Sequence, residues 1–172
     1  RLLSPEACRA QPCRSRAKPL PLYRSPPSRY PKRMDPDALA ALHARAFTTP
    51  PPWGAESFAG LLALPLTFLE TAPDGAAFLL GRVIAGEAEL LTLATDPASR
   101  RQGLAQQLMA RFEATARARG ATEAFLEVAE DNAPARALYA GCGYVQTGRR
   151  PGYYVAPTGN PVAALILCKS FA

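Results

Sequence analysis

The sequence is poor in the residues that most often build metal sites and catalytic triads. It contains one histidine, His43, on a predicted first helix, and we expect a solvated or packing role for it. Its four cysteines, Cys8, Cys13, Cys142 and Cys168, lack the spacing of a zinc site. With no secretion signal in the sequence, we interpret them as reduced thiols of a cytoplasmic protein. No metal is expected.

Long apolar runs are absent as well. No stretch approaches the ~18 apolar residues that a helix needs to cross a bilayer, so we expect no membrane partner. The 172 residues instead combine 48% apolar content with a length typical of one domain, which is enough for a sizeable core. The sequence therefore favours a single globular domain outside the membrane.

The positive charge is confined to one end of the chain. The net charge is +6, but residues 1–33 carry +8 and residues 34–172 carry −2. A slightly acidic domain argues against direct nucleic-acid binding. Residues 1–33 contain seven prolines and no glycine and show no helical or strand periodicity, so we expect a disordered, basic, proline-rich extension. A tail that contacts ribosomal RNA is the functional alternative.

Met34 marks the expected start of the folded domain, which we place at 34–172. Asp35 can cap a helix whose first position is Pro36, and residues 1–33 would then be dispensable.

Hydrophobic periodicity predicts helices over 36–47, 55–63 and 102–119, and strands over 66–71, 76–84, 87–95, 123–128 and 162–168. The last strand is apolar on both faces, so we expect it to be central.

The loop between the predicted strand 87–95 and the helix 102–119 carries the strongest functional signal. Its residues are Arg100, Arg101, Gln102, Gly103, Leu104 and Ala105. The first N–H groups of a helix lack internal partners and carry the positive end of the helix dipole, so they form an anion site. Gly103 allows close approach of the backbone. The loop thus predicts a phosphate-rich ligand, although the bare motif also occurs at ordinary helix starts.

The order of parts around this loop resembles the GNAT superfamily of acyl-coenzyme A N-acyltransferases, and the resemblance runs from Leu90 to Tyr144. Within the superfamily, the segments 125–139 and 149–154 are most similar to the ribosomal-protein alanine N-acetyltransferases. The resemblance implies an α/β (α+β) fold with a mixed, mostly antiparallel sheet of about six strands and helices on both faces. The first strand of that pattern is expected to be missing, because Pro21 interrupts residues 20–23.

The resemblance assigns acetyl-coenzyme A (acetyl-CoA) to the loop and its neighbours. Leu93 and Thr95 would offer backbone groups to the pantetheine arm, where their strand splays from the strand 123–128. Asn132 would contact the same arm, although it is also a good helix N-cap. Tyr139 lies seven residues later, about two helical turns, and therefore on the same helix face. In the family it would donate a proton to the coenzyme A thiolate.

Glu127 ends the predicted strand 123–128 and is the base that the resemblance implies. An α-amine with a pKa near ~8 must lose a proton before it can attack a thioester, so acetyl transfer at neutral pH needs such a base. Glu87 and Glu89, on the neighbouring strand, are the competing bases, because other members of the superfamily use a carboxylate there.

The acceptor side is expected to involve a loop with Arg149, Arg150, Tyr153 and Tyr154. Residues 160–162, before the last strand, depart from the family pattern, which affects peptide specificity more than the chemistry. The predicted function is acetyl transfer to the N-terminal alanine of a small-subunit ribosomal protein. A GNAT enzyme acting on lysine or small amines is one alternative, and a coenzyme A- or RNA-binding module without catalysis is another.

Overall fold

The computed structural model describes residues 34–171. In chain order the elements are α1 (Pro36–Ala46), α2 (Ala55–Leu62), β1 (Thr67–Thr71), β2 (Ala77–Ile84), β3 (Glu87–Thr95), η1 (Pro97–Ser99), α3 (Leu104–Ala118), β4 (Glu123–Ala129), α4 (Ala133–Gly141), β5 (Val145–Val155) and β6 (Pro161–Ser170). The elements predicted from periodicity are all present, with ends that differ by at most two residues. The expectations for the N-terminal extension, for Cys8 and Cys13 and for a missing first strand lie outside the described residues.

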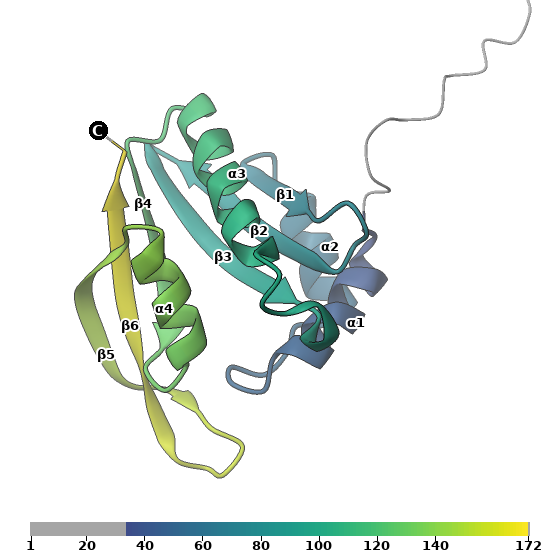
Figure 1. The fold of residues 1–172 in the computed structure, drawn as a ribbon, viewed down its shortest axis with the longest axis vertical. Helices are drawn as coiled ribbons and strands as arrows, with labels where there is room; N and C mark the ends of the chain where they lie inside the picture. Colours follow the sequence, from purple (N-terminus) through teal and green to yellow (C-terminus); the bar gives the residue numbers. More distant parts are fainter. Residues whose placement is uncertain (1–33, 172) are drawn as a thin grey trace, which may run out of the picture.

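The six strands form one sheet in the order β1-β2-β3-β4-β6-β5 (Figure 1). Strands β3 and β4 run parallel, and the other neighbouring pairs are antiparallel. Strand β6 has a hydrogen-bonded partner on each side, β4 and β5, and is therefore an internal strand. The predicted mixed, mostly antiparallel sheet is therefore confirmed, as is the internal position of its last strand.

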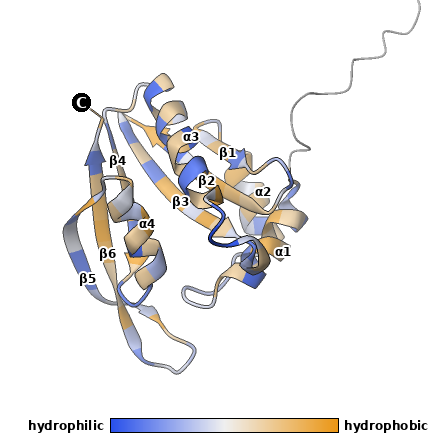
Figure 2. Ribbon diagram, in the orientation of Figure 1, coloured by the Kyte–Doolittle hydropathy of each residue, from blue (hydrophilic) through white to orange (hydrophobic). Residues whose placement is uncertain are grey.

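Helices cover both faces of this sheet, and each layer has its own core. Figure 1 shows α3 and α4 on the near face and α1 and α2 behind β2 and β3. The near core contains Leu108 and Phe112 of α3 against Leu126 of β4, all almost fully buried. The far core contains Leu39 and Phe58 of the first two helices against strand β2. Figure 2 shows the matching apolar colouring along β2, β3 and β6.

Local sequence explains where the first elements begin and turn. The Asp35 carboxylate accepts the backbone N–H of Ala38 at 2.8 Å, and Pro36 occupies the first turn, so the predicted N-cap is confirmed. Between β2 and β3, Ala85 and Gly86 both have positive φ, at 52° and 87°. Two left-handed residues in a two-residue hairpin match the right-handed twist of the flanking strands.

The prediction that residues 149–154 form a loop is wrong, because they belong to strand β5. Arg149 and Arg150 pair with β6, and the pairing resumes at Tyr154 after a shift in register. Pro151 and Gly152 lie in the resulting bulge, where Gly152 has a φ of +61°. Proline is tolerated there because β5 is an edge strand, and the bulge hides the strand from a period-two pattern.

Candidate active site

The parallel strands β3 and β4 separate halfway along their length. Their pairing runs from Glu87 with Glu123 to Leu90 with Leu126, although β3 continues to Thr95. At the same point Leu91 is an extra residue in the β2–β3 register, and such a bulge bends a strand. The predicted splay is therefore present. Beyond this point, the backbone groups of β3 and β4 no longer pair with each other.

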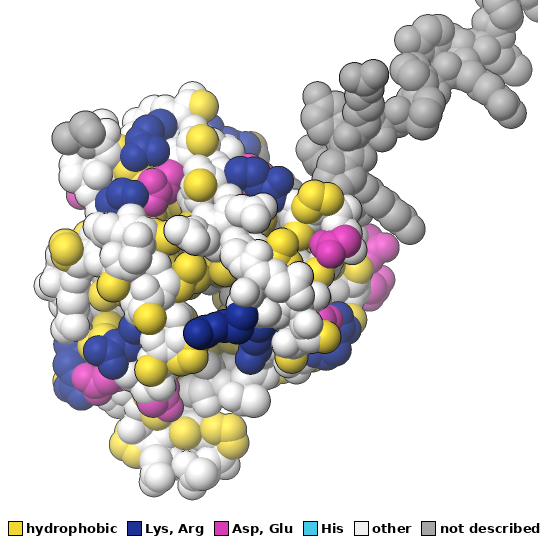
Figure 3. Space-filling view, in the orientation of Figure 1, with side chains coloured by type: hydrophobic (Ala, Val, Ile, Leu, Met, Phe, Trp, Pro, Cys, Tyr) yellow, Lys and Arg dark blue, Asp and Glu magenta, His cyan; other side chains and the backbone are white. Residues whose placement is uncertain are grey.

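The predicted pantetheine strand is the part of β3 beyond this separation. Leu93 and Thr95 lie there, opposite Leu79 and Ala77 of β2. Figure 3 shows a hollow near the centre of this face of the molecule, with Lys and Arg side chains at its edge. An extended ligand could pair with the free side of β3 as a strand would.

The loop before α3 presents backbone N–H groups in an unusual conformation. Arg101 has a φ of +65° and Gly103 a φ of +79°. A left-handed residue other than glycine costs on the order of 1 kcal/mol, and such residues cluster at functional sites. Gly103 is the N-cap of α3 and supplies no side chain to its first turn, so those N–H groups stay available to an anion. The helix begins at Leu104, two residues later than predicted, so Gln102 precedes it.

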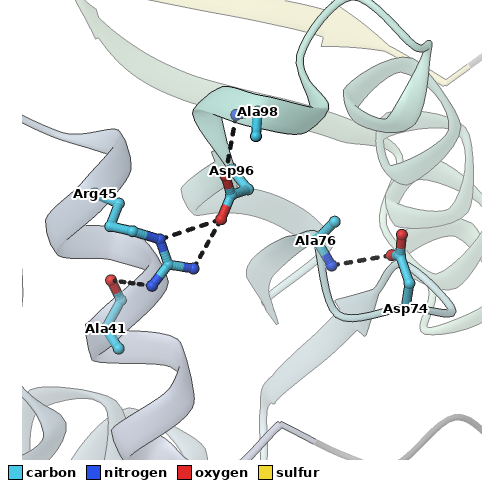
Figure 4. A network of polar contacts seen from close by, with 6 residues as sticks. All are labelled: Ala41, Arg45, Asp74, Ala76, Asp96 and Ala98. Carbon is cyan, nitrogen blue, oxygen red and sulfur yellow. Dashed lines mark hydrogen bonds and ion pairs between the residues drawn. The ribbon is translucent and has the colours of Figure 1, made fainter.

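Long-range contacts fix this loop against α1. Figure 4 shows the Arg45 guanidinium on Asp96, where Nε and Nη2 lie 3.1 and 2.8 Å from Oδ2. The other oxygen of Asp96 accepts the N–H of Ala98 at 3.0 Å. That backbone bond, followed by the bonds from Arg45, lowers the pKa of the Asp96 carboxyl. Arg100 donates to the Ala46 carbonyl at 3.2 Å, so its side chain points to the end of α1.

We expected either a solvated or a packing role for His43, and the structure shows the packing role. Its ring is buried and stacks on Phe47 with centroids 3.9 Å apart. Nδ1 accepts the backbone N–H of Trp53 at 3.0 Å, and Nε2 lies 3.0 Å from the Thr92 hydroxyl on β3. Burial lowers the pKa of His43 to about 4, so the ring is neutral at physiological pH. The contact between His43 and Thr92 links α1 to β3, one of the two strands that separate from each other.

Glu127 lies one residue beyond the last β4 residue that pairs with β3. Its neighbours Leu126 and Val128 point into the core under α3 and α4, so Glu127 points to the opposite face. One carboxylate oxygen lies 3.0 Å from Nη1 of Arg150, a contact that the sequence did not indicate. The carboxylate thus faces the separated part of the sheet and is held by a cation.

The two competing bases lie elsewhere on β3. Glu87 and Glu89 both belong to the segment that still pairs with β4, before the strands separate. Glu89 forms an ion pair with Arg82 of β2, at 2.6 Å. Of the three carboxylates, Glu127 is the one located beyond the separation.

Helix α4 carries Asn132 and Tyr139 on the near face of the sheet, opposite the face to which Glu127 points. The Asn132 side chain accepts the N–H of Ala135 at 3.2 Å, so it does cap the helix. Tyr139 is buried in the near core, in edge contact with Tyr144 at 6.2 Å between centroids. Burial raises the pKa of the Tyr139 phenol, and the charges of Cys142 and Tyr154 add to the rise. Tyr139 therefore keeps its proton at neutral pH.

The residues predicted for the acceptor side lie on strand β5. Tyr154 lies near enough to Glu127 that its pKa, raised mainly by burial, is raised further by that carboxylate, to about 12. Arg149 binds Glu130 through two hydrogen bonds of 2.8 and 2.7 Å. Tyr153 is half exposed and contacts the Tyr154 ring edge-on at 5.0 Å. An open pocket beyond them is lined by Glu130, Asp131, Arg149, Gly152, Pro161, Val162 and Ala163.

Known proteins share this arrangement. Residues 40–144 match the family described as Acetyltransferase (GNAT) family. The ribosomal protein bS18-alanine N-acetyltransferase of Escherichia coli (strain K12) is 31% identical over 132 residues, covering 76% of this chain and 89% of the relative. The crystal structure of the ribosomal-protein-S18-alanine N-acetyltransferase from Escherichia coli has a TM-score of 0.73 at 28% identity, covering 82% of this chain and 90% of that one.

Another solved structure, of Arabidopsis thaliana NAA60 in complex with acetyl-CoA, has a TM-score of 0.69 over 80% of this chain and 93% of that one. At 15% identity it shows the fold alone. Fold and family match together define an acyltransferase. The chain belongs to the GNAT acetyltransferase family, whose members transfer acetyl groups to nitrogen.

Among residues 34–171, no helix has the length and apolar character needed to span a membrane. Within the same range, no three or more His, Cys, Asp and Glu side chains are grouped so that they could hold a metal ion.

Proposed function

We propose that this enzyme acetylates the N-terminal α-amine of a protein in the cytoplasm, and that its acceptor is the N-terminal alanine of a small-subunit ribosomal protein. The observation that carries the proposal is the position of Glu127, just beyond the point where β3 and β4 separate. The ribosomal acceptor is supported by the relative that is 31% identical to this chain and named for that reaction.

Acetyl-CoA would enter from the side of α3. Its pyrophosphate would meet the backbone N–H groups of Arg101 to Ala105, which the left-handed Gly103 leaves uncapped. The acetyl-pantetheine arm would lie along Leu93 and Thr95, on the side of β3 that no longer pairs with β4. The Asn132 amide, exposed at the start of α4, would bind the same arm from across the opening.

Two side chains then handle the protons. Glu127 accepts a proton from the incoming ammonium, directly or through a water molecule, and the neutral amine attacks the thioester carbon. The nitrogen of the tetrahedral intermediate then loses its second proton to solvent, which returns a proton to Tyr139 after the thiolate has left. As the tetrahedral intermediate collapses, the bond to sulfur breaks and the Tyr139 phenol donates its proton to the departing thiolate. Burial raises the pKa of Tyr139, so the phenol is protonated at neutral pH and has a proton to donate. Arg149, Tyr153 and Tyr154 would contact the acceptor peptide.

The proposal is tested with one peptide in two forms, each beginning with alanine and containing one internal lysine. The first has a free α-amine, and in the second that amine is blocked. We expect acetylation of the free form at its N-terminus and none of the blocked form, measured by mass spectrometry. An α-amine is more often neutral than a lysine amine of pKa near ~10.4. Equal acetylation of lysine would exclude the α-amine specificity and favour the lysine-directed alternative.

A further inference from the structure

Arg150 contacts the proposed base from two strands away. Strand β6 lies between β4 and β5, and the register places Arg150 beside Ala164 and Glu127 beside Ile166. Side chains in register on neighbouring strands share a face, so Arg150, Ala164, Ile166 and Glu127 all lie on one face of the sheet. The Arg150 side chain spans the intervening strand β6, and its Nη1 ends 3.0 Å from Glu127 Oε1.

A second contact fixes the same guanidinium from its own strand. Three residues, 151–153, separate Arg150 from Tyr154, whereas their partners Ala164 and Val162 are separated by one. The bulge brings the Tyr153 ring to within 5.4 Å of the Arg150 guanidinium carbon, at cation–π distance. Arg150 is therefore held between an aromatic ring and a carboxylate.

The pair binds one oxygen of Glu127 and leaves the other available. Oε1 lies 3.0 Å from Arg150 Nη1 in an ion pair, and Oε2 forms no hydrogen bond with any residue that the structure describes. The Arg150 side chain is 54% exposed and that of Glu127 25% exposed, and ion pairs this accessible contribute little to fold stability. The contact is better suited to orienting the carboxylate than to holding the sheet together.

We propose that Arg150 is a positioning residue for Glu127: it fixes the carboxylate through Oε1 so that Oε2 faces the acceptor amine. This inference rests on the proposed role of Glu127 as the base. The titratable groups that face the pair are Tyr154, near Glu127, and Tyr153, against the guanidinium. Arg149, next in sequence, is bound to Glu130 and does not share the contact.

The test compares Arg150→Gln with Arg150→Lys. We expect Arg150→Gln to lower kcat roughly tenfold, because a misplaced base transfers protons slowly, with no change in KM for acetyl-CoA. Arg150→Lys should restore most of the activity. Arg111→Gln removes a remote ion pair of similar exposure, with Glu70, and should leave kcat unchanged.

The double variant Glu127→Gln/Arg150→Gln shows whether Arg150 acts through Glu127. If it does, losing Arg150 has no further effect once Glu127 is gone. A full tenfold loss in the Glu127→Gln background would overturn the inference. An unchanged kcat in Arg150→Gln, with Glu127→Gln impaired, would also overturn it. Both outcomes leave the proposed function intact. Normal activity of Glu127→Gln itself would remove the base assignment and the inference together.

Discussion

The two halves of the sheet are stabilised in different ways. Strands β1 to β3 are enclosed between helices on both faces, and β2 is buried along nearly its whole length. Strands β4, β6 and β5 have α4 on one face, while Glu127 and Arg150 lie on the other. Strand β5 is exposed at almost every position. Packing thus holds the proposed cofactor side, and exposed charged contacts shape the proposed acceptor side.

This difference separates the expected effects of mutations. On the cofactor side the ligand would bind to backbone groups, so changes there act through backbone conformation or through the packing that holds it. On the acceptor side the chemistry depends on a few side chains that contribute little to stability. Variants of the first kind should affect binding or folding, and variants of the second kind should affect turnover.

The largest effect is expected for Gly103→Glu, which should abolish acetyl-CoA binding in calorimetry. Gly103 has a φ of +79°, which side chains rarely adopt, and the new carboxylate would lie where the pyrophosphate is expected. Nothing crowds a Cβ at this position, since the nearest atom is Gln107 Nε2 at 3.8 Å, so the loss would come from backbone conformation and charge.

Gly120→Glu is the matched control, because Gly120 follows the other end of α3 with a φ of +86° and open space around it. It imposes the same backbone strain without touching the loop. We expect it to bind acetyl-CoA normally. Normal binding by Gly103→Glu as well would move the cofactor site away from the start of α3.

The half of the sheet that is enclosed between helices, β1 to β3, should also lose stability as the pH falls. His43 has a pKa of about 4 in the fold against 6.5 when free, so the unfolded chain binds a proton more readily between these values. Stability should be fully present above pH 6.5 and decline as the pH falls towards 4, by roughly 3 kcal/mol in total. Urea denaturation across this range measures the slope, and His43→Gln should flatten it. An equally steep slope in that variant would assign the loss to another group.

The two halves of the sheet also differ in how well their features could be predicted from the sequence. The loop around Gly103 and the caps at Asp35 and Asn132 were predicted because each depends on neighbours in the chain. Strand β5 was missed, since the bulge around Pro151 breaks the alternation that identifies a strand.

The ion pairs at the site join residues that only the fold brings together. Arg45 and Asp96 are 51 residues apart in sequence, and Arg150 reaches Glu127 across an intervening strand. The sequence of one chain contains no local signal for such pairs. His43 was hard to assign for a related reason, because its burial depends on Thr92 and Trp53, which belong to other segments.

In the other half of the sheet, formed by β4, β6 and β5, Glu127→Gln should lower kcat by roughly 10²-fold, within the range for loss of a general base. The melting temperature should hardly change, because the ion pair with Arg150 is accessible to solvent. Glu89→Gln is the informative companion, since Glu89 is also ion-paired but lies before the strands separate. If Glu89→Gln lost activity while Glu127→Gln kept it, the base would lie on β3.

The smallest effect is expected for Arg45→Gln, which removes an exposed contact from the packed half. Arg45 holds Asp96 at the start of the loop, and its side chain is 55% exposed. An accessible ion pair contributes little free energy, so KM for acetyl-CoA should rise no more than roughly fivefold at low salt. The difference from wild type should disappear at high salt, which screens the pair in both proteins. An increase that persists at high salt would mean that Arg45 supports the loop through its bond to the Ala41 carbonyl or through packing, and not through its charge on Asp96.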